Sequence, residues 1–238
     1  WQGILSIYIL VLLVTIIYLA YLKFFEKQLL EPRYLSLSSM LVVVTCLIAV
    51  LLPTGFSPYI LPIPAVIIIA AIFLSPRVAF LLSSLILTIL TVGMQYDSQF
   101  LIIFTILSLI GMITVSKIRY TRRFDLIKVG FNLSVAGLLI MLSLYFIDKC
   151  LIDVSNALIL RNCIFIFVNG LFSSIVALGV SPLLESTFHI ITPYGLAELG
   201  DHNQPLLKRL QIEAPGTYHH SLMVSTLCEA AAEAIGAN

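Results

Sequence analysis

Long, nearly uninterrupted apolar runs constrain this chain more than any other feature. A membrane-spanning helix needs about 20 mostly apolar residues, because the hydrocarbon core of a bilayer is about 30 Å thick. Runs that approach this length occur at residues 3–22, 34–52, 59–74, 78–94, 100–116, 129–147 and 163–184. The sequence therefore predicts an all-α fold, a polytopic membrane protein with seven transmembrane helices. The third run carries Pro62 and Pro64 near its start, which leaves a kinked or re-entrant segment open.

The composition excludes several classes of protein. Only 11% of the residues are charged and 60% are hydrophobic, whereas soluble domains carry about 25% charged residues. A water-soluble enzyme cannot cover its surface with so few charges. The net charge of +1 provides no field for steering nucleic acid. We therefore expect a lipid bilayer, and not DNA, as a partner.

Basic residues are unevenly divided among the loops. Nine lie in the first, third and fifth loops: Lys23, Lys27, Arg33, Arg77, Lys117, Arg119, Arg122, Arg123 and Lys128. The other three loops hold only Lys149 and Arg161. Because positively charged loops stay in the cytoplasm, the N-terminus is expected outside and the C-terminal tail inside. The predicted location is the plasma (inner) membrane, crossed several times.

The middle of every predicted span lacks ionisable residues. Ion-coupled transporters usually place such groups at depth, so this pattern argues against transport. Asn132 and Asn169 are the notable polar residues, and interhelical hydrogen bonding is the favoured interpretation, with ligand sensing as the alternative. Small residues that predict a tight helix–helix contact recur in the last run: Gly170, Ser173, Ser174 and Ala177.

The composition changes after residue 185, where the chain becomes polar enough for the cytosol. Pro205 predicts a helix start capped by Asn203. A second helix is expected to begin with Thr217 as its N-cap and to end at Gly236, which suits a left-handed C-cap.

Adjacent histidines, His219 and His220, are the chemical candidates in this tail. His220 shares a helical face with Val224 and Leu227, so that face is expected to point inward. Taken alone, the pair favours one exposed and one packed imidazole. A metal site requires at least three protein ligands, and this sequence offers no others at suitable spacing.

Three tail segments resemble a known family. They are NQPLL at 203–207, EAPGTYHHSLMV at 213–224 and EAAAEAIGAN at 229–238. They are similar to the start of the HD domain in the seven-transmembrane-receptor HD phosphohydrolases, the PgpH-type cyclic di-AMP phosphodiesterases of bacteria. The resemblance implies a membrane region at 1–185, a linker at 186–202 and the first part of a cytosolic all-helical HD domain at 203–238.

The resemblance also implies a metal site. The family holds a pair of divalent metals, manganese or iron, and its first ligand is the histidine of a His-Ser-x-x-Val pattern. In this sequence that residue is His220, followed by Ser221 and Val224. The remaining ligands would lie beyond Asn238. We therefore expect one metal ligand, no catalytic residue and no assignable substrate-binding residue within this chain.

The implied function is hydrolysis of cyclic di-AMP to the linear dinucleotide by a membrane-anchored signalling enzyme. The fragment alone is expected to be inactive. The expected partners are the cyclic dinucleotide substrate and an extracellular ligand bound by a domain preceding Trp1, with a homodimer left open. The alternatives are a membrane sensor with a non-catalytic HD-like tail and, less favoured, a transporter.

Overall fold

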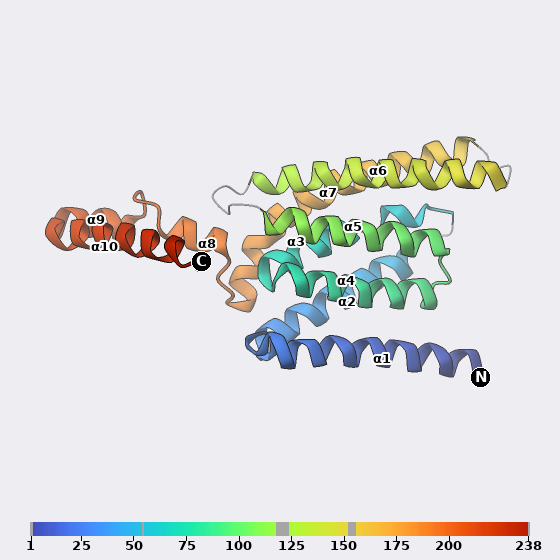
Figure 1. Ribbon diagram of the computed structural model, residues 1–238, viewed down its shortest axis with the longest axis horizontal. Helices are drawn as coiled ribbons and strands as arrows, with labels where there is room; N and C mark the ends of the chain where they lie inside the picture. The colour runs from blue at the N-terminus through green and yellow to red at the C-terminus, as the bar shows by residue number, and fades with distance from the viewer. Residues whose placement is uncertain (1, 54, 118–123, 152–155, 238) are drawn as a thin grey trace. The chain divides into compact units, whose positions relative to one another are not determined.

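The computed structural model describes residues 2–53, 55–117, 124–151 and 156–237. These residues form helices and no β-strand (Figure 1), which confirms the all-α prediction. The chain divides into two compact units, Trp1–Thr192 and Pro193–Asn238, and each is described here by itself. The second unit contains α8 (Pro193–Leu199), α9 (Pro205–Glu213) and α10 (Pro215–Ala234).

The first unit is a helical bundle. Its helices are α1 (Gln2–Phe25), α2 (Pro32–Leu51), α3 (Ile63–Phe73), α4 (Pro76–Gly93), α5 (Ser98–Ser116), α6 (Asp125–Leu151) and α7 (Asn156–Phe188). Two short 3₁₀ helices, η1 (Lys27–Leu30) and η2 (Pro58–Ile60), precede α2 and α3. Six of the described helices are long and apolar enough to cross a membrane, and α3 is the shorter exception. The bundle is therefore that of a multi-pass membrane protein, and the count of seven crossings stays a prediction.

The third apolar run is broken where its prolines lie. Helix α3 has 11 residues, and all of them are buried, so it is only about 16 Å long. Its neighbours shield it from lipid, and for that reason it need not match the hydrocarbon thickness by itself. The ring of Tyr59 lies 6.3 Å from the rings of both Phe100 and Phe104. Ile67 contacts Gly111, which lies farther along α5. The segment from η2 through α3 thus runs parallel to α5.

Successive helices of this unit run in opposite directions (Figure 1). One end of the bundle therefore gathers the last turns of α1, α5 and α7 and the first turns of α2, α4 and α6. Six cations belong to this end: Lys23, Lys27, Arg33, Arg77, Lys117 and Lys128. Arg119, Arg122 and Arg123 lie outside the described residues, as does the side chain of Lys149. We call this end the basic end.

Helices α6 and α7 approach each other closely. A Cβ atom on Gly170 would lie 2.4 Å from Oγ of Ser134, and one on Gly130 would lie 2.3 Å from Oγ of Ser174. The Ser134 hydroxyl donates to the carbonyl of Phe167 at 2.7 Å. The small residues of the last run therefore make the tight contact that the sequence predicts.

Asn169 holds the break between η2 and α3. Its Nδ2 donates to the carbonyls of Tyr59 at 2.8 Å and Leu61 at 2.7 Å, and its Oδ1 accepts from Ser173 at 3.0 Å. The helical pattern is interrupted between η2 and α3, and the side-chain amide replaces donors that a continuous helix would supply to these carbonyls. The predicted interhelical role of Asn169 is confirmed. Asn132 is exposed on α6 and makes no such contact within the described part of the chain, so the same prediction is wrong for it.

Candidate functional site

Helices α9 and α10 form the hairpin that carries the histidine pair. Pro205 is at the first position of α9, as predicted, but the N-cap residue is Gln204. Asn203, the expected cap, instead bonds to the carboxylate of Asp201 through its backbone N–H at 2.9 Å and its amide at 3.1 Å. Asp201 thus closes a turn immediately before the helix. The Asn203 side chain bonds within this turn and does not cap the helix.

Helix α10 begins earlier than the sequence indicated. Its N-cap is Ala214, Pro215 occupies the first turn, and no side chain caps the helix. Thr217 lies inside the helix, so the prediction that it is the N-cap is wrong. The fixed φ angle of proline suits the first helical position. The helix therefore starts at Pro215, before Thr217. His220 consequently lies in the second turn and not at the helix start.

The C-terminal end of α10 follows the predicted glycine cap. Gly236 has a φ of +67°. Its N–H donates to the carbonyl of Glu233 at 3.1 Å, and the N–H of Ala237 donates to Ala232 at 2.9 Å. These two bonds make a Schellman motif, which satisfies carbonyls that the helix end would leave unpaired.

One polar contact ties the hairpin together, and an ion pair lies within its first helix. The hydroxyl of Tyr218 lies 2.6 Å from Nδ1 of His202, which joins the first turn of α10 to the segment before α9. Arg209 and Glu213 form an ion pair at 2.7 Å along α9. His202 and Glu213 are therefore each engaged by a neighbour. Neither contact was predicted, although a tyrosine next to the histidine pair was visible in the sequence.

Both histidines of the pair are exposed, so the expectation of one packed imidazole is wrong for the described chain. Val224 and Leu227, on the face shared with His220, are 42% and 67% exposed. The face predicted to point inward is thus uncovered. Among the residues that the structure describes, no group of three or more His, Cys, Asp or Glu side chains could hold a metal. The described residues therefore do not assemble a metal site.

A polar joint closes the end of the first unit, where α7 leaves the bundle. The Thr192 hydroxyl donates to Oε1 of Glu185. The guanidinium of Arg33, in the first turn of α2, donates to the carbonyl of His189 at 3.3 Å. His189 has a φ of +52°, a conformation that ends α7 sharply. These contacts were not predicted from the sequence.

Comparison with known proteins places the first unit in a family. Residues 1–192 match the family described as a 7TM receptor with intracellular HD hydrolase. The chain belongs to this family. The family resemblance seen in the tail is therefore supported by the membrane part.

Curated relatives of this 7TM receptor with an intracellular HD hydrolase include two named cyclic-di-AMP phosphodiesterase PgpH. The protein from Listeria monocytogenes is 37% identical over 194 residues, which cover 80% of this chain and 25% of the relative. The protein from Bacillus subtilis is 30% identical over 190 residues, 76% of this chain and 26% of the relative. An uncharacterized protein of Synechocystis sp. is 30% identical over 199 residues.

The chain spans about a quarter of the length of the curated relatives it matches. The family match ends at residue 192, which is also the last residue of the first compact unit. No solved structure matches the chain. The comparisons thus bear chiefly on the membrane region of this family member.

Proposed function

We propose that this chain is the membrane region and the first helices of the catalytic domain of a cyclic di-AMP phosphodiesterase. The complete protein would hydrolyse the cyclic dinucleotide to its linear product. One observation carries the proposal: the chain belongs to a family of membrane receptors with an intracellular hydrolase. Two relatives that are named for this activity give further support. The proposal includes the division into a membrane region at 1–185, a linker at 186–202 and an HD-domain start at 203–238.

His220 is proposed as one ligand of a pair of divalent manganese or iron ions. Its imidazole is exposed, and of these two metals iron is the one that neutral imidazole suits. One imidazole is fewer than the roughly three protein ligands of a catalytic site, so we place the other ligands beyond Asn238. When bound, such a pair lowers the pKa of an attacking water and stabilises the oxygens of the phosphodiester.

The residues around His220 would orient its ring. The bond between Tyr218 and His202 restrains the first turn of α10, immediately before the turn in which His220 lies. The Schellman motif at Gly236 holds the other end of the helix. In this arrangement the chain provides a rigid helix from which one imidazole projects, and rigid support preserves the geometry of a metal ligand.

We further propose that the N-terminus lies outside the cell and that the tail lies in the cytoplasm of a bacterium. The support is the basic end of the bundle, which six described cations share and at which α7 ends (Figure 1). Cytoplasmic ends of membrane helices are enriched in such residues. A preceding extracellular domain would then bind the signal, and the bundle would connect that domain to the tail.

The decisive experiment measures hydrolysis of cyclic di-AMP by the full-length protein with added manganese. Formation of the linear dinucleotide supports the proposal. Binding of the dinucleotide without hydrolysis would favour the sensor with a non-catalytic HD-like tail. Passage of a solute through proteoliposomes without hydrolysis would favour the transporter. A protein of residues 1–238 alone should not hydrolyse the substrate under the same conditions.

A further inference from the structure

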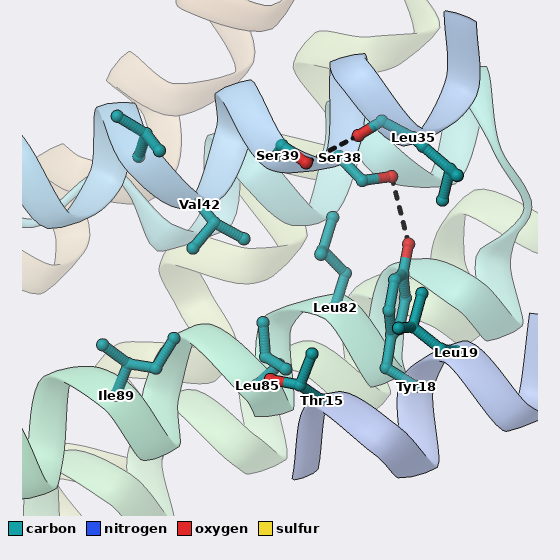
Figure 2. Close-up of a pocket in the computed structure, with 11 residues that line it drawn as sticks. Thr15, Tyr18, Leu19, Leu35, Ser38, Ser39, Val42, Leu82, Leu85 and Ile89 are labelled. Atoms are coloured by element: carbon teal, nitrogen blue, oxygen red, sulfur yellow. Dashed lines mark hydrogen bonds between the residues drawn. The ribbon is translucent and has the colours of Figure 1, made fainter. Parts of the chain in front are cut away.

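A groove lies among α1, α2 and α4 in the first unit (Figure 2). Its volume is about 400 Å³, which is within the range of about 300–1,000 Å³ that ligand pockets occupy. Apolar side chains from all three helices line it, among them Leu19, Val42 and Ile89. On its rim, Leu19 and Val43 are 43% and 63% exposed, so the groove opens on the outer surface of the bundle.

The groove begins close to one end of the bundle. Its lining along α2 extends from Leu35 to Val43, which is about 12 Å at the rise of an α-helix. This length is somewhat less than half of the hydrocarbon core, which is about 30 Å thick. Leu35 is close to the first residue of α2, Pro32, at the basic end. The groove therefore begins near the basic end, and along α4 it extends to Ile89, four residues before the last residue of that helix, Gly93.

The hydroxyl groups in the groove already donate within the protein. The Tyr18 hydroxyl, which points from α1 toward α2, donates to Oγ of Ser38 at 3.0 Å (Figure 2). Ser38 donates to the carbonyl of Tyr34 at 2.9 Å, and Ser39 donates to Leu35 at 2.8 Å. Thr15 donates to the carbonyl of Val11 at 2.8 Å. A ligand in the groove therefore needs no hydrogen-bonding partner, and an apolar ligand leaves none of these donors unsatisfied.

We propose that this groove binds one acyl chain of a membrane phospholipid. Helices α1, α2 and α4 are each long and apolar enough to cross a membrane, so the open side of the groove would face lipid hydrocarbon. An acyl chain can enter from that side without crossing a polar layer. Once bound, the chain contacts α1, α2 and α4 together and joins α1 to the rest of the bundle. Bound lipid would therefore stabilise α1 in this position.

The test fills the groove from two walls with larger side chains. Val42→Phe enlarges a side chain on α2, and Ile89→Phe enlarges one on the facing wall of α4. Val44→Phe is the matched control, because it makes the same substitution two residues after Val42. Val44 is 43% exposed and is not among the residues that line the groove. Each full-length protein is purified in detergent with phosphatidylglycerol, and bound lipid is counted by native mass spectrometry.

We expect wild type and Val44→Phe to retain one phospholipid. Both groove-filling variants should retain about tenfold less, since each excluded methylene weakens binding substantially. Added phosphatidylglycerol should raise the melting temperature of delipidated wild type and Val44→Phe, because a ligand of the folded state stabilises it. It should not raise that of the groove-filling variants.

Two results would overturn the proposal. One is equal lipid retention by wild type and both groove-filling variants. The other is loss of lipid from Val44→Phe to the same extent, which would assign retention to the general apolar surface. If one groove-filling variant fails to fold, the other still provides the comparison, because the two changes lie on different helices.

Discussion

The side-chain amide of Asn169 in α7 donates to the carbonyl of Tyr59 in η2, 2.8 Å away and 110 residues distant in the chain. This bond and the second bond from the same amide to the carbonyl of Leu61 connect α7 to the break between η2 and α3. Helix α3 is entirely buried, so a shift of this helix would displace the helices that surround it. The bond therefore supports the centre of the bundle and not only a local turn.

Replacing Asn169 with leucine should destabilise the bundle. The change removes the donors to two buried carbonyls, and we expect a loss of about 2 kcal/mol, since membrane hydrogen bonds are worth roughly 0.6–1.7 kcal/mol each. Thermal unfolding in detergent measures the effect. Asn132→Leu is the matched control, because Asn132 is exposed, and its stability should stay within about 0.5 kcal/mol of wild type. Equal effects at the two positions would contradict this account of Asn169.

Gly170→Ala should weaken the contact of α6 with α7. The new Cβ would lie 2.4 Å from Oγ of Ser134 and 2.7 Å from its backbone nitrogen, so the helices must separate at a cost of about 1–3 kcal/mol. Gly179→Ala, in the same helix, meets nothing within 4 Å. That control should be neutral or more stable by up to about 1 kcal/mol, because alanine is a better helix former. The unfolding temperatures of the two variants give the comparison, and a stable Gly170→Ala protein would show that the close approach is not required.

Thr192→Val should loosen the chain where α7 leaves the bundle. It removes the hydroxyl that donates to Glu185, and a bond of roughly 1 kcal/mol corresponds to about a fivefold change in local opening. Hydrogen–deuterium exchange of residues 186–192 should accelerate by that factor, while the global unfolding temperature changes little. Ser186→Ala is the control, since among the described residues the Ser186 hydroxyl donates to the carbonyl of Leu183 in its own helix. Unchanged exchange in Thr192→Val would show that the joint does not restrain this turn.

His220→Ala should lower the metal content of the full-length protein, and His219→Ala should not. Both imidazoles are exposed, so neither change should affect folding by more than about 0.5 kcal/mol. Loss of one of several ligands typically costs a large factor in metal affinity. Metal content by elemental analysis, with circular dichroism as the folding control, separates the two histidines. Equal metal content in both variants would remove His220 from the proposed site.

Helix positions in the bundle follow closely from local sequence. Each long apolar run forms a helix because a backbone in hydrocarbon must satisfy its own hydrogen bonds. Pro62 and Pro64 mark the break before α3 for a similar reason, since proline supplies no N–H. Gly236 ends α10 as expected, because glycine adopts the left-handed backbone conformation at little cost in free energy. These are constraints that act within a few residues.

Contacts between elements depend on what each residue meets across the fold. Asn132 and Asn169 look alike in the sequence, yet one is exposed and the other bridges two carbonyls. Ala214 and Pro215 begin α10 where Thr217 seemed the better cap, and Ala214 is also the C-cap of α9. The joint of Arg33 with His189 and the groove beside Tyr18 bring together residues from separate helices. The length of an apolar run determines locally where a helix forms. Which residues pack together depends on the tertiary arrangement of helix surfaces that are far apart in the chain.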